Sequence, residues 1–224
     1  MPVTEELEQV EAEIRPRLRG TLHRITAPIA AVAFIPLVVM AETTGDAIAV
    51  LVYGFCVTAM LTVSGTYHRA RLSDRARRVL KRIDHSTILL AIAGSYTAIT
   101  VLALDGAAEV VMLVVAWTAA TIGILIRMFW LDAPPPLVAA VYVISGWLLV
   151  FDLPAYLDGL SDGEFALIAA GGLLYTAGAV VYARTAPNPW PATFGYHEIF
   201  HTFVVVAAAC HYLAVLSLVR SSSL

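Results

Sequence analysis

Two histidines near the end of the chain have the spacing of a metal-binding pair. His197 and His201 are four residues apart, so on an α-helix both imidazoles lie on one face, one turn apart. Such a pair can chelate one ion, and His68 could supply a third nitrogen. Three protein ligands plus an open position for water are typical of a catalytic zinc site. Bound zinc lowers the pKa of water to about 7, so hydroxide becomes available at neutral pH.

An aspartate and a serine could complete this site. Asp84 could hold or deprotonate the water, which makes it the candidate general base. Ser64 lies one turn before His68 on the same helical face and could bond a metal ligand or a substrate carbonyl. Each residue also has a structural interpretation. Histidines within membranes often bond neighbouring helices, and a serine within a helix often bonds the carbonyl four residues earlier.

The composition requires a membrane around these residues. The 224 residues are 59% hydrophobic and only 14% charged, with a mean hydropathy of +0.80. A soluble domain is about 45–50% apolar and about 25% charged. This composition excludes a soluble enzyme, a coiled coil and a disordered chain. A net charge of −3 argues against a nucleic-acid partner.

Seven stretches of 17 to 21 residues contain no Asp, Glu, Lys or Arg, and each is long enough for a membrane helix. They are Ile25–Ala41, Ala47–Tyr67, Ser86–Leu104, Val110–Ile126, Ala133–Phe151, Phe165–Ala183 and Ile199–Val219. A β-barrel would instead show alternating segments of about 10 residues. We therefore predict an all-α, polytopic membrane protein, a bundle of seven transmembrane helices. Residues 25–219 form the transmembrane domain between an N-terminal segment (1–24) and a short tail (220–224).

Charge predicts the orientation of the bundle. Thirteen of the 14 basic residues fall in the N-terminal segment or on the loops of the same side, and only Arg220 falls on the other. The positive-inside rule places the N-terminus in the cytoplasm and the C-terminus outside, in a multi-pass protein of the inner (plasma) membrane. His68, Asp84, His197 and His201 then all lie near the cytoplasmic ends of their helices. His23, in the basic segment, is expected to be in solvent.

The start of the chain carries a weaker signal. Leu7, Val10 and Ile14 share one face of a helix that Pro16 should end. The segment is interpreted either as a helix on the membrane surface or as a solvated tail.

Three segments together resemble the bacterial haemolysin III family of the progestin and adiponectin receptor superfamily, to which alkaline ceramidases are more distantly related. They are Ser64-Gly-Thr-Tyr-His68, Ile83-Asp84-His85-Ser86 followed by Ala93-Gly94-Ser95-Tyr96-Thr97, and Phe194-Gly195-Tyr196-His197-Glu198-Ile199-Phe200-His201. The resemblance covers essentially the whole chain. It implies a seven-helix bundle with zinc bound by His68, His197 and His201, and with Asp84 and Ser64 beside it. It also implies hydrolysis of ceramide-like lipid amides, with membrane lipids as partners and a fatty-acyl substrate.

Three other functions are weighed against a lipid amide hydrolase. The sequence His197-Glu198-x-x-His201 fits the zinc-protease signature, with Glu198 as base. However, Glu198 would point about 100° away from the histidine face. A second interpretation is a sensor or regulator of membrane state in which zinc only holds helices together. A channel would need a polar path, and the outer halves of the helices carry few polar groups besides His211.

Overall fold

The fold described here is that of a computed structural model, which describes residues 16–70 and 72–222. The proposed surface helix around Leu7, Val10 and Ile14 lies outside these residues.

The described residues form an all-helical bundle with seven helices long and apolar enough to cross a membrane. Six of these spans are single helices: α2 (Thr21–Met40), α3 (Thr44–Arg69), α4 (Asp74–Ala103), α5 (Gly106–Phe129), α8 (Asp162–Arg184) and α9 (Tyr196–Ser222). The fifth span consists of α6 (Pro135–Gly146), the 3₁₀ helix η1 (Leu148–Asp152) and α7 (Leu153–Gly159). The prediction of seven membrane helices is confirmed.

The helices extend beyond the uncharged stretches because polar residues cap them. The Thr43 side chain accepts a hydrogen bond from the backbone amide of Asp46, and the Asp46 carboxylate accepts one from the backbone amide of Thr43. This pair caps the start of α3. Ser73 caps α4, so this helix begins twelve residues before Ser86, the expected start of the third span. Asp84 therefore lies inside a helix rather than at its entrance.

The fifth span is interrupted where a single helix was expected. Tyr96 reaches across from α4 and bridges the break. Its hydroxyl donates to the carbonyl of Gly146 (2.9 Å) and accepts from the backbone amide of Leu149 (2.9 Å). Backbone groups at membrane depth need protein partners because lipid supplies none. Tyr96 provides them, which explains how the change from α-helix to 3₁₀ helix is tolerated.

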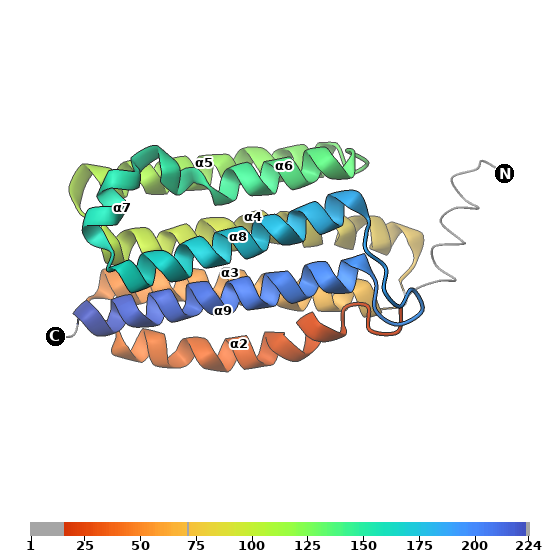
Figure 1. Cartoon of the computed structure of the whole chain (residues 1–224), viewed down its shortest axis with the longest axis horizontal. Helices are drawn as coiled ribbons and strands as arrows, with labels where there is room; N and C mark the ends of the chain where they lie inside the picture. The colour runs from red at the N-terminus through yellow and green to blue at the C-terminus, as the bar shows by residue number, and fades with distance from the viewer. Residues whose placement is uncertain (1–15, 71, 223–224) are drawn as a thin grey trace.

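The helices run up and down, so α2, α4, α6 and α9 begin at one end of the bundle, where α3, α5 and α8 finish (Figure 1). We call this the basic end, since it carries Arg17, Arg19, Arg24, Arg127, Arg184 and the basic segment between Arg69 and Arg82. α3 packs between α2 and α4, and α9 packs chiefly against α8 while also touching α2 and α4. α5 and α6 form an outer layer in Figure 1. The space among α3, α4, α6, α8 and α9 is lined by His68, Asp84, His197 and His201, among other residues.

Gly94 permits the close approach of α3 and α4, which sets the position of Asp84 relative to His68. A Cβ atom at Gly94 would lie 2.8 Å from the Cβ atom of Cys56. We therefore expect Gly94→Val to lower the free energy of unfolding by about 1–3 kcal/mol, measured as a reduced thermal midpoint in detergent. Gly163→Ala is the matched control, because nothing lies within 4 Å of its added Cβ. Equal midpoints for the two variants would contradict this account of the packing.

Candidate metal centre

Three histidines meet at the basic end. His68 lies in the last turn of α3, and His197 and His201 lie in the first two turns of α9. One ligand atom from each lies within 4.8 Å of the other two. The Nε2 atoms of His68 and His197 are 3.0 Å apart. The predicted juxtaposition of the three imidazoles is therefore present.

The donor set suits a metal ion. Two imidazole nitrogens approach to 3.0 Å either when one donates a proton to the other or when both lone pairs point at one ion. Nitrogens bound tetrahedrally to zinc at 2.0–2.1 Å are about 3.4 Å apart. The spread of the three ligand atoms needs only small side-chain shifts to reach that arrangement. The residues present therefore fit a zinc-sized ion, although imidazole also binds other divalent metals.

Asp84 and Ser64 lie beside the cluster. A carboxylate oxygen of Asp84 is 3.8 Å from Nε2 of His68, and both side chains are buried. The side chain of Ser64 is buried and lines the same cavity as Asp84 and the three histidines. A carboxylate in the position of Asp84 can accept a proton from a molecule at the cluster. The structure thus brings together all five residues singled out from the sequence.

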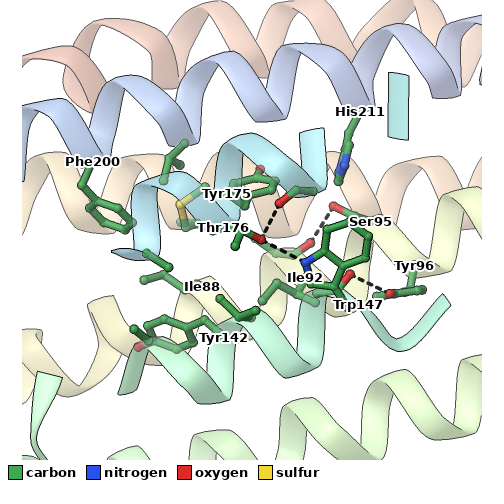
Figure 2. Close-up of a pocket in the computed structure, with 18 of the residues that line it drawn as sticks. Ile88, Ile92, Ser95, Tyr96, Tyr142, Trp147, Tyr175, Thr176, Phe200 and His211 are labelled. Carbon is green, nitrogen blue, oxygen red and sulfur yellow. Dashed lines mark hydrogen bonds between the residues drawn. The ribbon is translucent and has the colours of Figure 1, made fainter. Parts of the chain in front are cut away.

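A cavity of about 130 Å³ extends from this cluster along the bundle. Its wall is mostly apolar and aromatic, with Ile88, Ile92, Tyr142, Trp147 and Phe200 surrounding the space in Figure 2. His211 lines its distant part, ten residues or about 15 Å along α9 from His201. The cavity is thus polar at the cluster, while most of its lining surface is apolar.

His23 is buried, so the expectation that it lies in solvent was wrong. Its ring is 2% exposed and stacks on His201, with ring centroids 3.8 Å apart and planes 9° from parallel. α2 starts at Thr21, which directs its first turn into the bundle. The turn before it needs Gly20, whose φ is 72° and whose added Cβ would lie 2.6 Å from that of His68. His23 shares the basic end with the other histidines, and that shared position was the available signal.

Glu198 holds the start of α9. One carboxylate oxygen binds Arg19 at 2.6 Å, and the other accepts the backbone amide of Gly195 at 2.7 Å. The negative charge of a carboxylate at a helix N-terminus also interacts favourably with the positive end of the helix dipole. These contacts engage both oxygens away from the histidine face. The geometry therefore favours Asp84 over Glu198 as a base at the cluster.

A buried arginine beside the cavity was not singled out from the sequence. Arg127 is 2% exposed and donates to the carbonyls of Trp130 (3.1 Å) and Leu131 (2.9 Å), just beyond the end of α5. It also contacts Nδ1 of His85 at 2.5 Å. The hydroxyl of Tyr142 donates to the His85 carbonyl at 3.2 Å. These bonds join α4, α5 and α6 next to Asp84.

Comparison with known proteins identifies the family of this chain. A family model described as "Haemolysin-III related" matches residues 12–212. The chain is 28% identical to "Hemolysin-3" of Bacillus cereus over 218 residues, which cover 96% of both chains. It is also 28% identical to "Hemolysin-3 homolog" of Bacillus subtilis (strain 168) over 197 residues, 87% of this chain and 89% of that protein. The chain therefore belongs to the haemolysin III-related family of multi-pass membrane proteins, within the progestin and adiponectin receptor superfamily.

Proposed function

We propose that this protein is a zinc-dependent hydrolase of lipid amides, with its metal centre on the cytoplasmic side of the plasma membrane. The observation that carries the proposal is the position of the histidine cluster. Three imidazoles that can share one ion lie beside a buried carboxylate, at one end of a mostly apolar cavity. Intramembrane ionisable groups are costly and mark functional sites.

The chain's own residues would divide the work as follows. His68, His197 and His201 would hold the ion, which supplies a Lewis acid that polarises a carbonyl and acidifies water. Asp84 would accept a proton from the attacking water and deliver it to the leaving amine as the C–N bond breaks. Ser64 would orient the Asp84 carboxylate. The products are a fatty acid and an amine.

The cavity supports a lipid rather than a peptide as substrate. Its lining is dominated by aliphatic and aromatic side chains from α4, α6, α8 and α9. An acyl chain could fill this space while its amide lies at the cluster, as in ceramide-like lipids drawn from the membrane.

A non-catalytic role has one specific observation in its favour. The cluster joins helices that are distant in sequence: α3 supplies His68, α9 supplies two ligands, and His23 of α2 stacks on one of them. A metal there could serve only to hold the bundle in one arrangement, as a sensor or regulator of membrane state would require.

The metal is tested first. We expect detergent-purified protein to contain about one zinc per chain with no metal added, measured by elemental analysis, because three imidazoles converge. His201→Ala should lose most of it, since one of three protein ligands is gone. His211→Ala is the matched control, because this histidine lies in the cavity but outside the cluster. Absence of metal from the parent protein would remove the basis of both proposals.

The base is tested next. Asp84→Asn should lower fatty-acid release from a panel of N-acyl lipids at least about 100-fold while zinc content stays the same. Glu198→Gln should keep turnover and lower the thermal midpoint, because removing a partner from charge-assisted bonds costs about 1–3 kcal/mol.

Either of two results would contradict this assignment. If Glu198→Gln abolishes turnover and Asp84→Asn does not, the base is Glu198 and the protease interpretation returns. If zinc is bound but no lipid amide or ester is cleaved, the non-catalytic role is favoured.

A further inference from the structure

The contact between Arg127 and His85 determines which nitrogen of His85 carries a proton. A guanidinium can only donate hydrogen bonds and stays protonated in proteins. Its Nη2 atom lies 2.5 Å from Nδ1 of His85, so Nδ1 must be the acceptor. The proton of the neutral ring is therefore on Nε2. The buried Arg127, itself held by the carbonyls of Trp130 and Leu131, keeps His85 as an N–H donor.

This donor is available to a ligand. His85 lines the same cavity as Asp84 and the histidine cluster. Within residues 16–70 and 72–222, the structure gives its Nε2 atom no hydrogen-bond partner. The surrounding protein does not completely enclose this atom. A donor at the wall of a largely apolar cavity needs an acceptor, since a polar group left unpaired there costs free energy.

The position of His85 specifies which part of a ligand it can reach. Consecutive residues of a helix point about 100° apart. Asp84 faces α3, where it lies near His68, whereas the imidazole of His85 contacts Arg127 of α5. The donor is thus at the depth of the cluster but displaced toward α5. An oxygen bound there belongs to the polar part of a ligand, beside its scissile carbonyl.

We propose that His85 is a specificity-determining residue that donates a hydrogen bond to an acceptor oxygen in the amine half of the lipid. The acceptor oxygen does not belong to the acyl half, because the apolar part of the cavity accommodates the acyl tail. The inference rests on the proposed function, whose ceramide-like substrates are themselves N-acyl amino alcohols, and it adds the residue that recognises their head-group oxygen. The preferred substrates are N-acyl amino alcohols and related amides with a head-group oxygen, rather than simple N-alkyl amides.

The test uses two substrates that differ only in this oxygen: N-dodecanoylethanolamine and N-dodecanoylpropylamine, in which a methyl replaces the hydroxyl. For the full-length, zinc-loaded protein we expect kcat/KM to be several-fold to about tenfold higher for the ethanolamide, the ratio that one hydrogen bond supplies. His85→Phe should bring the ratio to about one. His85→Gln, whose amide retains an N–H donor, should keep part of the preference.

Tyr142→Phe separates recognition from packing. It removes the bond from Tyr142 to the His85 backbone and leaves the Nε2 proton in place, so the substrate ratio should remain that of the parent protein. A merely structural role for His85 predicts that His85→Phe lowers both rates alike and leaves the ratio unchanged. That result, or a parent protein that does not distinguish the two amides, would overturn the proposal.

A binding measurement distinguishes failure of the His85 proposal from failure of the hydrolase proposal. Trp147 lines the cavity, so quenching of its fluorescence reports occupancy, with Trp147→Phe as the control for the signal. If the parent cleaves neither amide but binds the ethanolamide about tenfold more tightly, and His85→Phe removes that difference, the hydrolase proposal fails and the assignment of His85 stands. Equal binding of both amides by a protein that cleaves neither would overturn both.

Discussion

Lipid offers no hydrogen bonds, so every polar group at membrane depth must find its partner within the protein. The whole structure follows from this constraint. It selects helices for the backbone and explains why Tyr96 bridges the break in the fifth span. It also requires the ionisable side chains to gather. At the basic end, the side chain of His68 contacts those of His197 and Asp84. A shared ion there would bind the imidazole lone pairs, which apolar neighbours leave without a partner.

The same constraint explains why so much was accessible from the sequence. Uncharged stretches of helical length are unmistakable, and the alternation of basic and acidic loops places each helix end. Once the ends are assigned, His68, Asp84, His197 and His201 must share one end of the bundle. Their meeting is therefore a consequence of topology, and the spacing of His197 and His201 adds the common helical face.

What escaped prediction depends on contacts between helices that no local pattern encodes. Burial of His23 requires the first turn of α2 to pack against α9, and nothing near His23 in the sequence signals that contact. Arg127 is one of the basic residues counted for the orientation, but its guanidinium reaches His85 of α4, 42 residues away. Glu198 fits a protease signature in sequence, yet Arg19, 179 residues away, engages it. In each case a distant partner decides the role.

The histidine cluster also imposes an order on assembly. His68 and His197 are separated by 129 residues, and α9 is synthesised after the other six spans. While those six spans enter the membrane, His23 and His68 still lack the imidazoles of α9 that they contact. Insertion of α9 is therefore the step that completes the cluster. An ion that binds all three imidazoles could be captured only after this insertion, and it would then hold α9 in place.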